Sequence, residues 1–152
     1  MRVSASEQDI RAALIQHWAA SDANDFSTEH QIYYDDAILD YPQSGERIRG
    51  RANIQASRTV QPSKKRFEVR GILGSGHLWV TEYTLYYDEK PFHTVSIMEF
   101  RDGKVAYETQ YFGEPFAPGA SRSRFVEPIG PASAPTEKIS DAAITEPVPR
   151  QI

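Results

Sequence analysis

The chain has 152 residues, a formal charge of −4 and no cysteine. Its length fits one domain with an ordinary hydrophobic core, and the lack of cysteine excludes disulfides, thiolate nucleophiles and cysteine-ligated metals. Without a cluster of Lys or Arg, this acidic balance argues against nucleic acid and anionic membranes as partners. No apolar run approaches the ~20 residues of a membrane helix, and residues 1–10 lack the apolar core of a signal peptide. We therefore expect a cytoplasmic protein.

Helical patterns dominate the first sixty residues. Ser6 is a candidate N-cap, and apolar residues recur on one helical face after it, which predicts a helix ending near residues 21–24. A shorter helix is predicted from Phe26 and is expected to include Tyr33 and Tyr34. A short strand, a loop and a third helix follow in the prediction, over residues 37–41, 42–50 and 52–60.

Strand patterns fill the second half. They cover residues 66–73, 78–87, 92–101 and 104–112, and the Asp-Gly pair at 102–103 is the strongest hairpin signal in the chain. Helices followed by an antiparallel meander predict an α+β fold, with the helices on one face of the sheet. Proline-rich sequence begins near residue 128, so we assign residues 1–127 to one domain and residues 128–152 to a tail.

Three stretches together resemble the NTF2-like superfamily, which includes SnoaL-like polyketide cyclases and ketosteroid isomerases. They are HWAASDANDFSTEHQIYYDDAILDYPQSGERIRGRANI, HTVSIMEFRDGKVAYETQYF and GEPFAPGASRSRFVE. The resemblance covers about residues 7–127 and implies a cone-shaped, cystatin-like fold, a curved antiparallel sheet wrapped around N-terminal helices. This fold hosts isomerases, cyclases, dehydratases, epoxide hydrolases and non-catalytic binding domains, so it does not by itself identify an activity.

Comparison with the ketosteroid isomerases implies the location of a site but not its mechanism. The oxyanion tyrosine of that family falls at His17, its catalytic aspartate at Tyr41, and its second oxyanion acid near Val95 or Ser96. All three residue types have changed. A tyrosine with an ordinary pKa near ~10 cannot simply replace the carboxylate that removes a proton.

Strand alternation predicts which side chains line the cavity. If residues 102–103 are the two central residues of the hairpin, Ile97 lies opposite Glu108 and Val95 opposite Gln110, on a shared face. The predicted catalytic residues are Glu108, Glu82, His17 and Tyr41, and the predicted substrate-binding residues are Trp18, Tyr33, Tyr86, His93, Val95, Ile97, Gln110 and Phe112.

The aromatic residues that alternate with this set are expected on the outer face of the sheet. They are Trp79, Tyr83 and Tyr87. Exposed aromatics on a sheet usually have a partner, and the resemblance implies a homodimer through this face. His30 is expected at the surface, and Asp40 on the opposite side of its strand from Tyr41. No pair of residues has metal-ligand spacing, so we predict neither a metal nor a cofactor.

Three functions remain open. The first is binding of a small, partly apolar metabolite, with cofactor-free proton transfer by Glu108 or Glu82 and with His17 and Tyr41 as hydrogen-bond donors. The second is a non-catalytic ligand-binding or dimeric assembly module, in which His17 is a core histidine and the glutamates face solvent. The third is an epoxide hydrolase. The epoxide hydrolases of this superfamily need an Asp-Arg-Asp arrangement around a water molecule, and the sequence shows no evident buried arginine.

Overall fold

The computed structural model describes residues 5–130. Most of the predicted tail, residues 131–152, lies outside the described residues. The elements in chain order are α1 (Glu7–Asp22), α2 (Phe26–Glu29), the 3-10 helix η1 (His30–Ile32), β1 (Tyr33–Tyr41), β2 (Glu46–Arg49), α3 (Arg51–Thr59), β3 (Lys65–Ser75), β4 (Leu78–Tyr87), β5 (Lys90–Arg101), β6 (Lys104–Gly113) and the 3-10 helix η2 (Ala120–Arg122).

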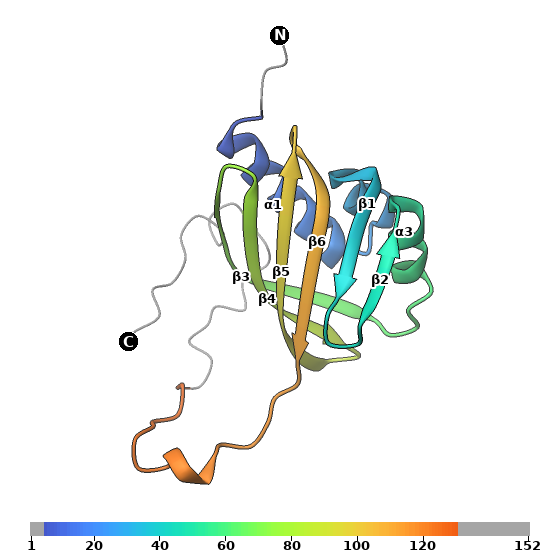
Figure 1. The fold of residues 1–152 in the computed structure, drawn as a ribbon. Coiled ribbons are helices and arrows are strands. Elements are labelled where there is room, and N and C mark those ends of the chain that lie inside the picture. Colours follow the sequence, from blue (N-terminus) through green and yellow to red (C-terminus); the bar gives the residue numbers. More distant parts are fainter. Residues whose placement is uncertain (1–4, 131–152) are drawn as a thin grey trace.

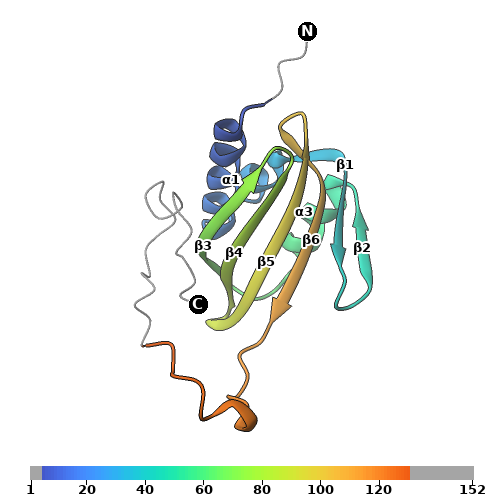
Figure 2. The ribbon, with the colours of Figure 1, turned by 60° about the vertical axis from the view of Figure 1, so that its left-hand side comes forward.

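The six strands form one curved, open sheet with α1 and α3 on its concave side (Figures 1 and 2). The strand order is β2-β1-β6-β5-β4-β3, and only the β1–β6 pair among the described strands is parallel. The predicted α+β fold, with a curved sheet around N-terminal helices, is confirmed. The helices bury the concave face, which is where any interior cavity must lie.

Helix α1 begins where the sequence predicts. The Ser6 hydroxyl accepts the Asp9 backbone N–H at 3.1 Å, and the Asp9 carboxylate accepts the Ser6 N–H, which forms a capping box. Leu14 and Trp18 on the inner side of the helix are buried. The Trp18 indole N–H donates to Thr81 Oγ1 at 3.1 Å, and this bond ties the helix to β4.

Two predicted elements between α1 and α3 differ from the structure. Tyr33 and Tyr34 open β1 instead of closing a helix. Residues 42–50, predicted as a loop, contain β2, which pairs with the end of β1 in a hairpin. As predicted, Asp40 points away from the interior, and it forms an ion pair with Arg47 at 2.7 Å.

A one-residue bulge separates the predicted register of β5 and β6 from the observed one. Phe100 of β5 pairs with Val105 of β6. The residue before it, Glu99, pairs with Tyr107, so Ala106 is an extra residue of β6 without a partner on β5. Beyond the bulge Met98, not Ile97, lies opposite Glu108. The predicted inward face of β5 was therefore wrong, because a shift of one residue turns every side chain to the other face.

The bulge also decides the face of β4. Tyr87 pairs with Lys90 across a two-residue turn, in which Asp88 and Glu89 both have positive φ (49° and 66°). The two strands share faces, so the residues of β4 and β5 that were predicted to line the cavity point outward: Glu82 and Tyr86 on β4, and His93, Val95 and Ile97 on β5. The aromatics predicted outside lie inside: Trp79, Tyr83 and Tyr87.

Past the end of β6, residues 114–130 extend away from the sheet (Figures 1 and 2). The segment carries large apolar side chains in the open. Phe116 is 85% exposed, Phe125 75% and Ile129 95%. Among the described residues, no helix is long and apolar enough to cross a membrane.

Candidate functional site

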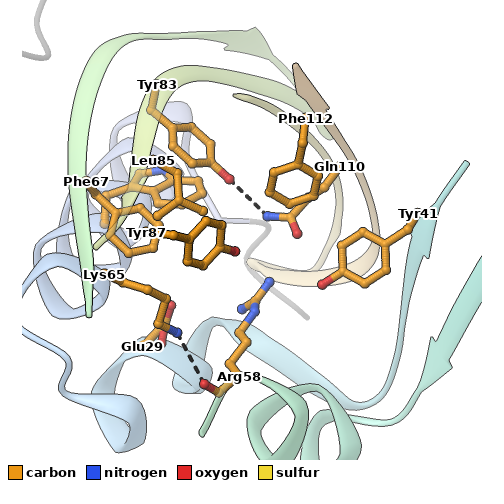
Figure 3. A pocket seen from close by; sticks show the side chains of 11 residues that line it. Glu29, Tyr41, Arg58, Lys65, Phe67, Tyr83, Leu85, Tyr87, Gln110 and Phe112 are labelled. Atoms are coloured by element: carbon orange, nitrogen blue, oxygen red, sulfur yellow. Dashed lines mark hydrogen bonds between the residues drawn. The ribbon is translucent and has the colours of Figure 1, made fainter. Parts of the chain in front are cut away.

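A cavity opens between the concave face of the sheet and helix α3 (Figure 3). It has an inner chamber of about 40 Å³ and a wide mouth of about 490 Å³. Tyr41, Arg58, Lys65 and Tyr87 line both parts. The inner chamber is also lined by Trp18, Glu29, Phe67, Tyr83, Leu85, Gln110 and Phe112.

Stacked aromatic rings and a fixed polar network both line the chamber, and Tyr83 belongs to both. Trp18 packs against Tyr83, with the ring centroids 4.5 Å apart. The Gln110 side-chain amide donates to the Tyr83 hydroxyl at 3.0 Å and to Ser96 Oγ at 2.9 Å. Because these buried groups satisfy one another, they fix the orientation of the Gln110 amide.

Arg58 is the central charged residue of the site. It follows Ile54 by one helical turn, so the two side chains share the inner face of α3, and only 11% of the Arg58 side chain is exposed. Its guanidinium donates to the Tyr33 hydroxyl at 3.0 Å and contacts Glu108 Oε1 at 3.3 Å. It also lies 3.2 Å from His30 Nε2.

The charges around Arg58 decide its protonation. Burial alone would lower the pKa of Arg58, but Tyr33 and the carboxylates of Glu108 and Glu29 raise that pKa well above its ordinary value. The site therefore holds a permanent buried cation. The sequence shows no evident buried arginine, but the structure buries Arg58.

Glu108 lies behind Arg58 with its carboxylate fully buried. Its Oε1 accepts hydrogen bonds from Tyr33, at 2.5 Å, and from Arg58. Its Oε2 has no hydrogen-bond partner among the described residues. A buried carboxylate oxygen without a partner is rare in folded proteins and costs stability.

Two tyrosine hydroxyls, those of Tyr41 and Tyr87, point into the cavity beside the guanidinium of Arg58 (Figure 3). Burial raises the pKa of both, and raises that of Tyr87 to about 12. Both phenols are protonated at neutral pH, so each can donate a hydrogen bond to a bound molecule.

A second carboxylate and a second cation lie on the other side of Arg58. The Glu29 carboxylate accepts a hydrogen bond from Ser21 Oγ at 2.6 Å. Burial alone would raise the pKa of Glu29, but Arg58 and His17 together lower it. The Lys65 ammonium donates to the Arg58 carbonyl oxygen at 3.3 Å.

His17 is buried outside the inner chamber, although it was predicted to act in it. Its Nδ1 lies 2.6 Å from the Glu29 carbonyl oxygen, which fixes the ring. Burial lowers the pKa of His17 to about 4, so the ring is neutral at pH 7. His30 was predicted at the surface but is also buried, with its Nδ1 2.6 Å from the Phe26 carbonyl oxygen.

The structure brings part of the predicted site together and separates the rest from it. Trp18, Tyr41, Gln110 and Phe112 line the cavity, while Tyr33 and Glu108 lie directly behind Arg58. On the outer face, the Glu82 side chain is 42% exposed and lies 3.8 Å from Arg70, and Tyr86 donates to Glu68. The remaining predicted lining residues, His93, Val95 and Ile97, share that outer face.

Sequence reasoning missed five polar lining residues of the inner chamber: Glu29, Arg58, Lys65, Tyr83 and Tyr87. Arg58 had a usable signal, since it lies four residues after the apolar Ile54 in a predicted helix. Tyr87 was assigned to the wrong face with the rest of its strand. Within residues 5–130, no group of three or more His, Asp or Glu side chains is arranged to hold a metal ion.

Comparison with known proteins identifies the family. The sequence model of the SnoaL-like domain matches residues 12–108. The chain belongs to the SnoaL-like family. No relative was found among proteins with curated descriptions.

Solved structures agree with this assignment. An NTF2-like protein of unknown function from Burkholderia xenovorans is 59% identical, with a TM-score of 0.76 over 82% of this chain and 98% of that one. A candidate ketosteroid isomerase from Kribbella flavida is 23% identical, with a TM-score of 0.75 over 83% and 93% of the two chains. An LEH-like epoxide hydrolase from Mycobacterium tuberculosis is 22% identical, with a TM-score of 0.60 over 69% and 83%. The last two share the fold with this chain.

Proposed function

We propose that this SnoaL-like protein binds a small, partly apolar molecule in its cavity and catalyses cofactor-free proton transfer on it, with Glu108 as the acid–base group. The reaction is of the isomerase, cyclase, dehydratase or hydrolase type. The observation that carries the proposal is the buried carboxylate of Glu108, which has one oxygen held by Tyr33 and Arg58 and the other without a partner. A catalytic role is one explanation for a buried polar group that has no hydrogen-bond partner.

The neighbouring groups suit this role. The hydrogen bonds to Oε1 hold the carboxylate in place and leave Oε2 to accept or return a proton. Because Glu108 lies behind Arg58 and does not line the chamber, this proton passes between Oε2 and the bound molecule through one bridging water. The phenols of Tyr41 and Tyr87 can donate hydrogen bonds to negative charge that develops on the bound molecule, and Arg58 supplies a fixed positive charge beside them. His17 is left out of the proposed chemistry, because its Nδ1 is engaged by the Glu29 carbonyl oxygen and its pKa, lowered to about 4 by burial, makes the ring a weak base.

Proteins of the same fold support the class of reaction. The structures from Kribbella flavida and Mycobacterium tuberculosis are described as a candidate ketosteroid isomerase and an LEH-like epoxide hydrolase. Isomerisation and epoxide hydrolysis both require proton transfer, which acid–base groups positioned in a cavity can supply.

The test uses two probe reactions and does not require the natural substrate. Deuterium incorporation from D2O into cyclopentanone, followed by NMR, reports proton transfer at carbon, and hydrolysis of styrene oxide reports activation of water. We expect the wild-type chain to accelerate at least one reaction, and Glu108→Gln to lower that rate by about 10²–10⁴-fold. The matched control is Glu99→Gln, because Glu99 is an exposed glutamate of the same sheet.

Either of two results would count against the acid–base role. One is a Glu108→Gln rate equal to that of the wild type. The other is a wild-type rate no faster than buffer with both probes. In the second case, saturable binding of cyclopentanone seen by NMR would leave a protein that binds without catalysis.

That non-catalytic alternative has its own supporting observation. The inner chamber of about 40 Å³ is far smaller than the ~300–1,000 Å³ of a typical small-molecule site, and only the open mouth of about 490 Å³ reaches that size. Residues 114–130 also expose Phe116, Phe125 and Ile129, as an assembly module would. A ligand-binding or dimeric assembly role predicts no difference between the wild type and Glu108→Gln in either probe reaction.

A further inference from the structure

Lys65 is a buried amine at the point where the mouth of the cavity meets the inner chamber. It is the first residue of β3, and only 6% of its surface is exposed. Its Nζ lies 5.0 Å from the centroid of the Phe26 ring and donates one hydrogen bond, to the Arg58 carbonyl oxygen. The side chain lines both parts of the cavity (Figure 3).

A structural role accounts for only part of this placement. Arg58 lies in the last turn of α3, where lysine side chains often satisfy unpaired carbonyl groups. That contact uses one of the three N–H groups of the ammonium ion. In the described part of the chain Lys65 forms no direct ion pair, and Glu29 acts on it only at longer range; a buried ammonium ion without a directly paired carboxylate is costly.

The surroundings favour the neutral amine more than an exposed site would. Burial lowers the pKa of Lys65, and the nearby Arg58 cation lowers it further against the opposing effect of Glu29. Desolvation next to another cation is one of the ways in which proteins activate lysine as a nucleophile.

A proton donor lies directly across the sheet. Lys65 and Tyr87 are cross-strand partners in the β3–β4 register, so their side chains lie side by side on the concave face. The Tyr87 hydroxyl points into the cavity and is protonated at neutral pH, since its pKa is raised to about 12. An amine and a phenol therefore flank the same entrance.

We propose that Lys65 forms a reversible imine with the carbonyl carbon of an aldehyde or ketone that enters the cavity. The neutral amine adds to the carbonyl carbon, and one proton moves from the attacking nitrogen to the former carbonyl oxygen to give a carbinolamine. The oxygen then takes a second proton from solvent water, the C–O bond breaks, and the oxygen leaves as water. Tyr87 donates a hydrogen bond to this oxygen. The nitrogen keeps its remaining proton as an iminium ion or releases it to solvent to give an imine.

The cavity walls define the rest of the substrate. Trp18, Phe67, Leu85 and Phe112 suit an aromatic or aliphatic body attached to the carbonyl group. The imine deepens the proposed function, because it needs the same cavity to admit a small molecule, but it does not depend on Glu108.

Reductive trapping tests the imine on the full-length wild-type chain. Benzaldehyde and sodium cyanoborohydride are added at pH 7, and the hydride reduces any imine to a stable benzylamine. Peptide mapping by mass spectrometry then gives the labelling rate of each lysine. The exposed residues Lys64, Lys90 and Lys104 are controls within the same molecule.

We expect Lys65 to be labelled at least tenfold faster than its neighbour Lys64. Labelling of Lys65 at the rate of Lys64 or more slowly overturns the proposal. The comparison needs no variant, so it is unaffected if replacement of Lys65 disturbs the end of α3. In Lys65→Arg, the fast label should disappear while the labels at Lys90 and Lys104 stay unchanged.

The two proposals fail separately. Slow labelling of Lys65 in a chain that still exchanges cyclopentanone protons through Glu108 removes the imine and leaves the proposed function. In the opposite case, Lys65 is labelled fast in both the wild type and Glu108→Gln, and neither chain exchanges cyclopentanone protons. That result removes the acid–base role of Glu108 and leaves the imine.

Discussion

The ion pair between Arg58 and Glu108 offers the sharpest test of the buried charge cluster. Arg58→Met removes the cation and keeps most of the volume of the side chain. Glu108 would then keep a single donor, the Tyr33 hydroxyl, for a carboxylate that is fully buried. The variant should therefore be less stable because of an uncompensated charge and not because of a cavity.

The expected size follows from burial. Removing one partner of a buried ion pair typically costs ~3–5 kcal/mol in a domain whose total stability is ~5–15 kcal/mol. Because 11% of the Arg58 side chain is exposed, we expect a loss near the lower end, about 3 kcal/mol. Adding Glu108→Gln to Arg58→Met should recover at least about 1 kcal/mol of this loss, since paired residues are coupled by ~0.5–3 kcal/mol.

Urea unfolding followed by tryptophan fluorescence measures these differences, because Trp18 and Trp79 are both buried in the folded chain. Arg47→Met is the matched control. Arg47 also binds one carboxylate and one tyrosine, Asp40 and Tyr107, but its side chain is 45% exposed, so its loss should change stability much less. The reasoning is refuted if Arg58→Met and Arg47→Met unfold at the same urea concentration. Strict additivity of Arg58→Met and Glu108→Gln in the double variant would also refute it.

Further predictions concern acid sensitivity, the cavity phenol and the outer face of the sheet. Burial lowers the pKa of His17 from 6.5 to about 4. Between these two pH values the unfolded chain binds a proton at His17 and the folded chain does not. The free energy of unfolding therefore falls by up to about 3 kcal/mol as the pH drops from 6.5 to about 4. His17→Asn should remove this part of the acid sensitivity in urea titrations at pH 7 and pH 4, and an unchanged difference between the two pH values would contradict it. Tyr87→Phe should slow benzaldehyde trapping at Lys65 several-fold without changing the trapping of Lys64, and equal rates at Lys65 would exclude the phenol from the reaction. We also propose a homodimer through the outer face of the sheet. Sedimentation equilibrium should give about twice the 17.2 kDa chain mass for the wild type and a monomer for Ile97→Lys. A monomeric wild type would reject this interface.

Much of the fold was predictable because its signals are local. The Ser6 cap, the Asp-Gly hairpin at residues 102–103 and the alternation of β6 beyond the bulge each depend on a few neighbouring residues. The side chains of Glu108 and Gln110 are buried inside the sheet as predicted. Their proposed roles in catalysis and binding stay predictions.

The rest of the site depends on features that a single sequence does not display. The extra residue at Ala106 leaves no local signal, and it reverses the face of every β5 and β4 residue beyond it. The turn at Asp88 and Glu89 uses two residues that seldom adopt positive φ, so it is not a recognisable hairpin signal. In the sequence Arg58 looks like an exposed charge, because its partners Tyr33 on β1 and Glu108 on β6 lie far from it along the chain.

The bulge at Ala106 gives β6 a place where its length can change without changing which side chains face inward. Without Ala106, Val105, Tyr107 and Glu108 would keep the partners that they already have on β5, namely Phe100, Glu99 and Met98. A deletion of one residue at any position between Glu108 and Phe112 would instead turn part of the strand to the other face. Ala106 is therefore the position of β6 where related chains can differ in length by one residue and keep the same pocket.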